Sequence, residues 1–199
     1  MKLKTGTHHR RSLRLQGYDY SRAGAYFVTI CTQNHECKFG KIADGRIQLN
    51  DAGKMVQAVW DEIPTHYNGI EIDEFVIMPN HFHGIVIIVN GFLPCYSDSE
   101  HLFDSLNPNK LSLSEVVHRF KTMTTKRYTD GVRQNGWPSF PGRLWQRNYW
   151  ERVVRNELEL RQIREYIQNN PSQWEMDKLF VGAAPRGRPE TAPRGRPEH

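Results

Sequence analysis

The sequence predicts an α+β fold in which an antiparallel sheet is covered by packed helices. Several segments alternate apolar and β-branched residues, as strands do, while others repeat apolar residues at helical spacing. The links between successive predicted strands are too short for the crossover that parallel strands require. The chain has 199 residues, which is enough for one domain with tails.

The predicted strands lie in the first half of the chain. Residues 25–30 form the first strand, and residues 39–42 and 46–49 flank an Ala-Asp-Gly turn as a hairpin. Two further strands follow, over residues 70–78 and 82–89. The last of these is among the most apolar runs in the chain, so we expect it to be central in the sheet.

Two helices are marked by capping residues. Asn50 or Asp51 caps a helix that an apolar stripe continues to Pro64, where we expect the helix to end. Ser112 and Glu115 form a capping box at the start of a second helix. Both helices have an apolar face that predicts packing against the sheet.

A third helix is expected from about Val153 to Asn169. It follows a connection rich in Gly, Pro and Trp over residues 131–143. It stops before Asn170-Pro171, because a residue that precedes proline avoids the helical region.

The net charge of +5 is unevenly distributed along the chain. Residues 1–22 carry a net charge of +5, residues 23–109 carry −7, and residues 110–180 carry +5. Such a polarity suits a protein that holds a polyanion on one side, although a charge count alone fits a solvated surface equally well.

Composition divides the chain into a basic arm over residues 1–22, a domain over residues 23–180, and a tail over residues 181–199. Within the domain, residues 90–110 lack periodicity and predict a flexible loop. The tail repeats Ala-Pro-Arg-Gly-Arg-Pro-Glu and has no large apolar side chain, so we expect disorder there.

Membrane and secreted classes are not favoured by this sequence. No run approaches the roughly 18 apolar residues of a membrane span, and the N-terminus lacks the apolar core of a secretory signal. The three cysteines are an odd number, which argues against a disulfide framework. We therefore expect a cytoplasmic protein.

His81 and His83 are the first candidate site residues. Because side chains at positions i and i+2 of a strand share a face, these two imidazoles should lie side by side while Phe82 points the other way. Two imidazoles on a rigid strand supply half of a divalent-metal site, but two structural histidines are the more common explanation of an isolated His-x-His.

Tyr166 and Asn170 are the second pair. They are four residues apart and so share one face of the last predicted helix. Taken singly, the tyrosine fits core packing, and the asparagine fits a helix C-cap before proline.

Four motifs, which follow one another along the chain, favour a functional role for these residues over a structural one. They are residues 17–30 (from Gly-Tyr-Asp-Tyr to Tyr-Phe-Val-Thr-Ile), Met-Pro-Asn-His-Phe-His-Gly-Ile over 78–85, residues 144–152, and Tyr-Ile-x-Asn-Asn-Pro over 166–171. Together they resemble the single-tyrosine HUH transposases (IS200-like), and among these the REP-associated tyrosine transposases. The resemblance covers roughly residues 10–180.

The resemblance implies a ferredoxin-like or RRM-like fold, the HUH endonuclease fold. It implies that His81 and His83 bind Mg²⁺ or Mn²⁺, that Asn170 is the third ligand unless Asn169 takes its place, and that Tyr166 attacks the DNA phosphate. The product would be a 5′-phosphotyrosine, and the activity that of a single-strand DNA endonuclease and strand-transferase. The protein would be a monomer or a homodimer.

Single-stranded or hairpin DNA is the expected partner, held by basic residues that have aromatic neighbours. The candidates for contact are Arg10, Arg11, Arg14, Arg119, Lys121, Lys126 and Arg147.

Three alternatives stay open. The first is a binding module without catalysis, which is disfavoured because the strand carries His81 and His83 instead of the stacked aromatics typical of such domains. The second is a metallohydrolase with a water nucleophile, which is disfavoured because no carboxylate cluster accompanies the histidines. A replication or conjugation nickase shares the chemistry but is usually a larger protein.

Overall fold

The computed structural model describes residues 17–89, 111–177 and 179. At its centre is a four-stranded sheet in which every neighbouring pair is antiparallel. In spatial order its strands are β4 (Ile70–Ile77), β5 (His81–Ile88), β1 (Gly24–Cys31) and β6 (Trp150–Val154). β5 is an inner strand, as the sequence predicts.

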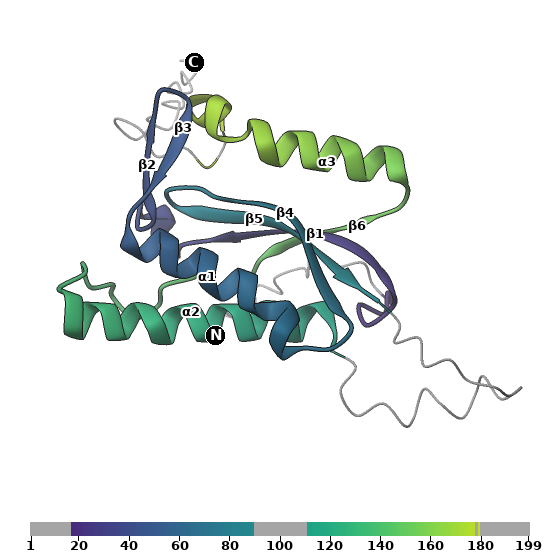
Figure 1. Ribbon diagram of the computed structural model, residues 1–199, viewed down its shortest axis with the longest axis horizontal. Coiled ribbons are helices and arrows are strands. Elements are labelled where there is room, and N and C mark those ends of the chain that lie inside the picture. Colours follow the sequence, from purple (N-terminus) through teal and green to yellow (C-terminus); the bar gives the residue numbers. More distant parts are fainter. Residues whose placement is uncertain (1–16, 90–110, 178, 180–199) are drawn as a thin grey trace, which may run out of the picture.

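Helices cover both faces of the sheet. α1 (Asp51–His66) and α2 (Leu113–Asn135) pack on one face, and α3 (Glu157–Asn169) lies across the other (Figure 1). The predicted α+β class with an antiparallel sheet and packed helices is confirmed.

The predicted caps form. The Asn50 side chain accepts a hydrogen bond from the Gly53 backbone N–H at 2.9 Å, and Ser112 and Glu115 make the capping box of α2. The expected end of α1 at Pro64 is wrong, because the helix runs two residues further to His66. Proline removes one backbone donor in the last turn, which a helix tolerates when its remaining bonds close around it.

The expected start of the third helix at Val153 is also wrong. Residues 150–154 form the edge strand β6, which pairs with β1, and α3 begins only at Glu157. The Asn156 side chain caps α3 by accepting from the Glu159 N–H at 2.9 Å. This cap starts the helix after the strand and separates the two elements.

Two hydrophobic cores hold the layers together. The larger lies between the sheet and the α1–α2 layer, where Trp60 meets Phe82 with ring centroids 4.5 Å apart. The smaller lies under α3, and its buried members are Val76, Met78, Ile85, Ile163, Ile167 and Trp174. The smaller core docks α3 onto the face of the sheet that bears the predicted histidines.

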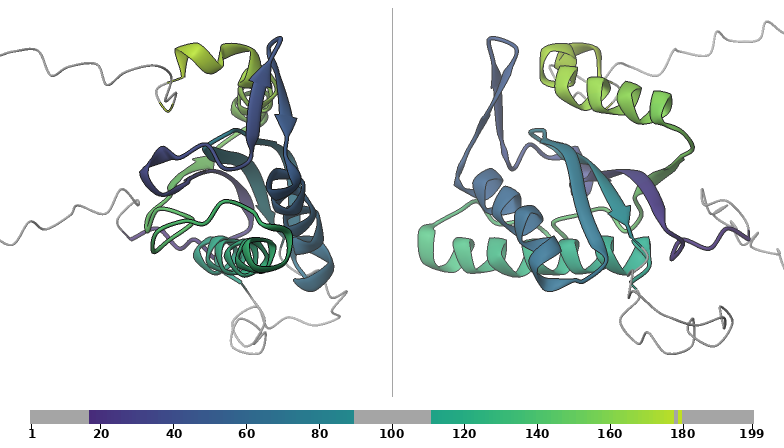
Figure 2. Two further views of the ribbon diagram at one scale, coloured as in Figure 1. Left: turned by 90° about the vertical axis from the view of Figure 1, so that its left-hand side faces the viewer. Right: turned by 45° about the vertical axis from the view of Figure 1, so that its right-hand side comes forward.

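A second, two-stranded sheet is formed by the hairpin of β2 (Gly40–Ala43) and β3 (Arg46–Leu49). It rises beside the end of α3 and the short 3-10 helix η2 (Pro171–Met176), as Figure 2 shows. A Cβ at Gly45, in the hairpin turn, would be 3.7 Å from Ser172 of η2. The hairpin therefore supports the segment that follows α3.

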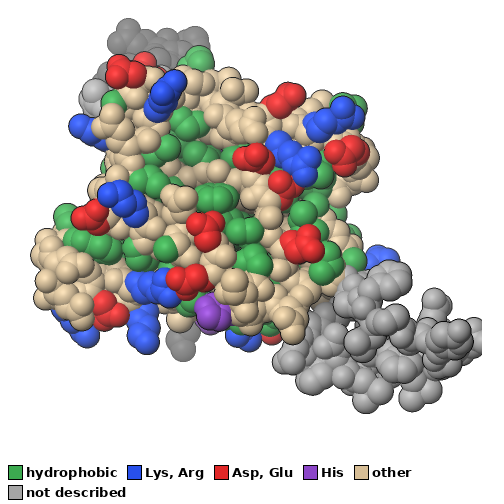
Figure 3. Space-filling model, in the orientation of Figure 1, with side chains coloured by type: hydrophobic (Ala, Val, Ile, Leu, Met, Phe, Trp, Pro, Cys, Tyr) green, Lys and Arg blue, Asp and Glu red, His purple; other side chains and the backbone are tan. Residues whose placement is uncertain are grey.

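The predicted arm, loop and tail fall largely outside the described residues. Tyr18 and Tyr20, within the predicted arm, pack against the larger core. The face drawn in Figure 3 has Lys and Arg side chains interspersed with Asp and Glu. Among the described residues, no helix is both long and apolar enough to cross a membrane.

Candidate metal centre and nucleophile

His81 and His83 lie side by side on β5, facing α3. Both side chains are buried, with ring centroids 4.5 Å apart. Phe82 points to the opposite face and packs on Trp60. The strand alternation predicted from the sequence therefore places the two imidazoles together.

Two neighbouring side chains orient the imidazoles. The Oδ1 atom of Asn80 is 2.8 Å from Nδ1 of His81. On the adjacent strand β1, the Oγ1 atom of Thr29 is 2.8 Å from Nδ1 of His83, its partner in the ladder. Because both contacts use Nδ1, each Nε2 atom is directed away from the strand, and partners of this kind fix the orientation of metal-binding histidines.

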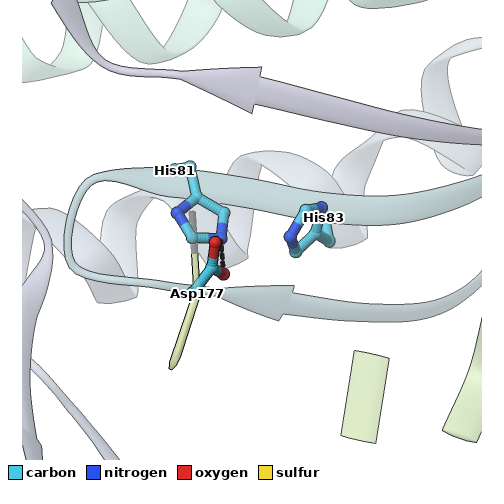
Figure 4. Close-up of side chains that lie close together, drawn as sticks. All are labelled: His81, His83 and Asp177. Carbon is cyan, nitrogen blue, oxygen red and sulfur yellow. Dashed lines mark ion pairs between the residues drawn. The ribbon is translucent and has the colours of Figure 1, made fainter. Parts of the chain in front are cut away.

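A carboxylate joins the pair from the other end of the domain. Asp177 follows η2, and its Oδ2 atom is 3.7 Å from Nε2 of His81 (Figure 4). One ligand atom from each of His81, His83 and Asp177 lies within 4.8 Å of the other two. This spacing allows the three side chains to bind one metal ion.

Asn170 is buried beside this cluster, whereas Asn169 is exposed. The Nδ2 atom of Asn170 is 3.4 Å from Oδ2 of Asp177, and its Oδ1 atom is buried without a hydrogen-bond partner. Asn170 also caps the end of α3. Of the two asparagines, only Asn170 lines the pocket described next.

Tyr166 and His83 line the same pocket. The Tyr166 side chain is 44% exposed, and its hydroxyl is 3.4 Å from Nε2 of His83. The pocket has a volume of about 570 Å³. Its lining residues include Thr29, His83, Trp150, Tyr166, Asn170 and Asp177. A phenol, an imidazole, an amide and a carboxylate thus meet in one open cavity.

Burial keeps the histidines neutral. It lowers the pKa of His81 to about 4, although the charge of Asp177 opposes the shift. Burial also lowers the pKa of His83 well below its ordinary value, and His81 adds to this effect. Neutral imidazoles have the free lone pair that a metal ligand needs.

The pKa of Tyr166 is raised, first by burial and then by the charge of Asp177. The phenol is therefore protonated at neutral pH in the metal-free protein. A positive charge close to Asp177 would oppose this effect.

The donor set fits a divalent metal ion. Nε2 of His81 and Oδ1 of Asn170 are both buried and lack hydrogen-bond partners among the described residues. Buried polar atoms without partners are rare because they are costly. Two imidazole nitrogens, a carboxylate and an amide oxygen are a common ligand combination for divalent ions.

The basic residues predicted to contact DNA occupy varied positions. Arg10, Arg11 and Arg14 lie outside the described residues. Arg119 stacks over the Tyr67 ring at 4.6 Å, while Lys126 and Arg147 are exposed.

Lys121 is partly buried. Its ammonium donates to the carbonyls of Gln146, Arg147 and Asn148 at 2.9, 3.4 and 3.2 Å. Burial lowers its pKa to about 8.

Three residues of the site, Asp177, Asn80 and Thr29, were not predicted from the sequence. Asn80 precedes the histidine pair and could have been recognised as a candidate for orienting it. Asp177 had no comparable signal, since it reaches the site through η2.

The sequence of this chain is similar to those of known proteins. Residues 92–170, which include Tyr166 and Asn170, match the family described as "Transposase IS200 like". A protein of Haemophilus influenzae described as uncharacterized is 43% identical over 183 residues, which cover 90% of this chain and 98% of that protein.

Two solved structures are similar. One is a REP-associated tyrosine transposase bound to a REP hairpin, with 19% identity, a TM-score of 0.51, and coverage of 80% of this chain and 73% of that one. The other is a putative transposase from Deinococcus radiodurans, with 19% identity, a TM-score of 0.40, and coverage of 78% and 95%. The first of these shares the fold of this chain, an antiparallel sheet with packed helices. The chain described here belongs to the IS200-like transposase family.

Proposed function

We propose that this protein is a metal-dependent single-strand DNA endonuclease and strand-transferase, and that Tyr166 is its nucleophile. The observation that carries the proposal is the position of the phenol. Its hydroxyl lies 3.4 Å from Nε2 of His83, in the pocket that also contains Asp177 and Asn170. Membership of the IS200-like family supports the same assignment.

His81, His83 and Asp177 would hold the metal ion, with Asn170 as a further oxygen ligand. The carboxylate and amide oxygens favour Mg²⁺ or Mn²⁺. A bound divalent ion would polarise the DNA phosphate and stabilise the charge of the transition state.

The Tyr166 oxygen attacks the phosphorus and forms a 5′-phosphotyrosine. The bond between phosphorus and the 3′ oxygen of the preceding nucleotide breaks. The phenol loses a proton, and the leaving oxygen gains one to become a 3′-hydroxyl. The new ester keeps roughly the energy of the original phosphodiester, so another 3′-hydroxyl can displace Tyr166 without ATP. Strand transfer is therefore the reverse of cleavage: the new 3′-hydroxyl attacks the phosphorus, and the bond between phosphorus and the Tyr166 oxygen breaks.

Single-stranded or hairpin DNA is the substrate that we propose. The REP-associated transposase of similar fold was solved with a REP hairpin, which concerns that protein, but the shared fold makes a hairpin the first DNA to test. The exposed Lys126 and Arg147 supply positive charge for it. One copy contains the proposed ligands and the nucleophile, so the chemistry fits a monomer as well as a homodimer.

The test is the covalent adduct. Wild-type protein is incubated with Mg²⁺ or Mn²⁺ and a hairpin DNA labelled on the 3′ side of the cut, then separated by denaturing electrophoresis. The label should travel with the protein, and peptide mapping should place it on Tyr166. Tyr166→Phe removes only a hydroxyl from a side chain that is 44% exposed, so folding and DNA affinity should persist while cleavage and adduct disappear.

Tyr149→Phe and Tyr128→Phe are the control variants, and both should form the adduct. Cleavage by Tyr166→Phe would indicate a water nucleophile and a metallohydrolase. DNA binding without any cleavage in the wild type would indicate a binding module.

A further inference from the structure

Trp150 lies in the same row of the sheet as the site. In the register of the strands, His83 pairs with Thr29 and Thr29 pairs with Trp150, so the three residues cross β5, β1 and β6 side by side. Neighbouring strands are roughly 5 Å apart, which puts the Trp150 backbone about 10 Å from that of His83. The indole is 46% exposed, although tryptophan is usually well buried.

Trp150 also separates two pockets. It lines the pocket of Tyr166 and a second pocket of about 760 Å³ formed with Gln33, Asn34, Arg143, Gln146 and Arg147. A third pocket of about 540 Å³ shares Arg143, Gln146 and Arg147 with the second and extends along α2 to Lys126. We call the second and third pockets together the Trp150 groove.

The groove is basic, and none of its described lining residues is acidic. Arg143, Arg147 and Lys126 are exposed, and none has an acidic partner within the described ranges. Elsewhere such partners are present: Arg127 is paired with Glu62, Arg152 with Glu159 and Arg164 with Asp73. Unpaired cations gathered in one depression favour a polyanion.

The loop over residues 145–148, which forms part of the groove, is fixed by hydrogen bonds to α2. Lys121 donates to three consecutive carbonyls of residues 146–148, and the Trp145 indole N–H donates to Thr124 at 2.8 Å. The side chains of Gln146 and Arg147 therefore project from a fixed backbone. A groove prepared in this way loses less entropy when it binds a ligand.

We infer that the Trp150 groove binds the unpaired DNA that continues from the cleaved phosphate, with one base stacked on Trp150 and phosphates on Arg143 and Arg147. This inference rests on the proposed function. A half-exposed aromatic beside cations is the usual combination for single-stranded nucleic acid, whose bases stack and whose backbone is held by charge. The amides of Asn34 and Gln146 also line the second pocket.

The test compares two DNAs in EDTA, so that binding is measured without cleavage. One is a hairpin with a single-stranded extension on each side of its base, and the other is the same hairpin with blunt ends. Trp150→Ala should lose about tenfold in affinity for the extended hairpin and change little for the blunt one. Trp150→Phe keeps a stacking ring and should retain most of the affinity.

The matched control for Trp150 is Leu158→Ala, which shortens a large exposed apolar side chain that lines none of the three pockets. It should leave both affinities unchanged. If Trp150→Ala binds both DNAs like the wild type, or weakens both equally, the inference is wrong.

A second readout uses wild-type protein and so does not depend on the folding of a variant. 2-Aminopurine, placed at successive positions of the extension, should lose fluorescence at one position through stacking on the indole. Signals unchanged by the protein at every position would overturn the inference.

The salt dependence tests the arginines. Arg143→Gln with Arg147→Gln should reduce the slope of log affinity against log salt by about 1.4 for the extended hairpin, since each single-strand phosphate contact contributes about 0.7. The control pair, Lys41→Gln with Arg133→Gln, removes two exposed cations outside the three pockets and should leave the slope unchanged. An equal effect of both pairs would contradict the groove.

Failure of this inference is distinguishable from failure of the proposed function. A Tyr166 adduct without any effect of Trp150→Ala on DNA affinity would support the proposed nuclease and rule out DNA binding in the Trp150 groove. A base stacked on Trp150 in a protein that forms no adduct would support binding in the groove and rule out the proposed nuclease.

Discussion

Asn80 fixes the tautomer of His81. Its Nδ2 atom donates to the carbonyls of His35 and Leu179 at 3.2 and 2.7 Å, so its Oδ1 atom is the one that faces Nδ1 of His81 at 2.8 Å. An amide oxygen only accepts, so Nδ1 must carry the proton. The lone pair of His81 is thereby left on Nε2, the atom that faces Asp177.

Asn80→Ala should therefore weaken metal binding by about 10- to 100-fold, the usual effect of losing a partner that orients a ligand. Titration of Mn²⁺ into metal-free protein by calorimetry measures this. Asn80→Asp keeps an acceptor for Nδ1 and should retain much of the affinity, even though both variants lose the two carbonyl contacts. Asn68→Ala, at an exposed position, is the control. Wild-type affinity in Asn80→Ala would show that the backbone alone orients His81.

Asp177→Asn should reduce Mn²⁺ affinity by about tenfold or more, because it removes the negative charge from the ligand set while keeping the shape of the side chain. Glu175→Gln, an exposed carboxylate two residues earlier, is the matched control and should bind like the wild type. The same titration measures both. Equal affinity of Asp177→Asn and wild type would leave His81, His83 and Asn170 as the ligand set.

The metal-free protein should lose stability as the pH falls from about 6.5 toward 4. Burial lowers the pKa of folded His81 to about 4, whereas the unfolded imidazole has its ordinary value of 6.5. Across this window the unfolded state binds more protons, so acid favours unfolding, by at most about 3 kcal/mol for this group.

Thermal unfolding in EDTA at several pH values measures the effect. His81→Gln should flatten the dependence, while His66→Gln, an exposed histidine on α1, should not. Parallel curves for His81→Gln and wild type would assign the pH dependence to other groups.

Replacing Lys121 should affect the stability of the protein, whereas replacing Lys126 should affect its DNA binding. Lys121→Met leaves three carbonyls without their donor and should lower the free energy of unfolding by about 1–3 kcal/mol. Lys126→Met should leave stability unchanged and reduce the salt slope of DNA binding by about 0.7 to 0.9. Chemical denaturation and binding titrations on both variants make the comparison. A stable Lys121→Met with a reduced slope would make Lys121 a phosphate contact instead.

The basic arm is expected to hold phosphates. Replacing Arg10, Arg11 and Arg14 together with Gln should reduce the salt slope by about three on duplex DNA, and by less on single strands. Binding titrations over a range of salt concentrations provide the slope. An unchanged slope would place the arm away from the DNA.

Local signals predicted most of the fold. The first five strands and the starts of α1 and α2 follow from alternation and capping, which depend on neighbouring residues. β6 was missed because it ends only two residues before the cap Asn156, and Val153 and Val154 fit the apolar stripe of the helix that follows. Only pairing with β1 distinguishes the two structures, and that contact is not local.

The same distinction applies to the site. His81 and His83 were predictable because residues two positions apart on a strand share a face. Asp177 was not, because η2 and the β2–β3 hairpin determine where it lies. Lys121 was predicted as a DNA contact, and only the folded loop shows which carbonyls its ammonium meets.

The contact of His83 with Tyr166 spans 83 positions of the chain, and α2 and β6 lie between the two residues in the sequence. A ribosome adds roughly 5 to 20 residues per second, so the imidazoles are synthesised on the order of 10 s before the phenol. During that interval a growing chain already contains the histidines but lacks the group that would bond to DNA. In the proposed mechanism, the site would therefore become able to cut DNA only after Tyr166 has been synthesised.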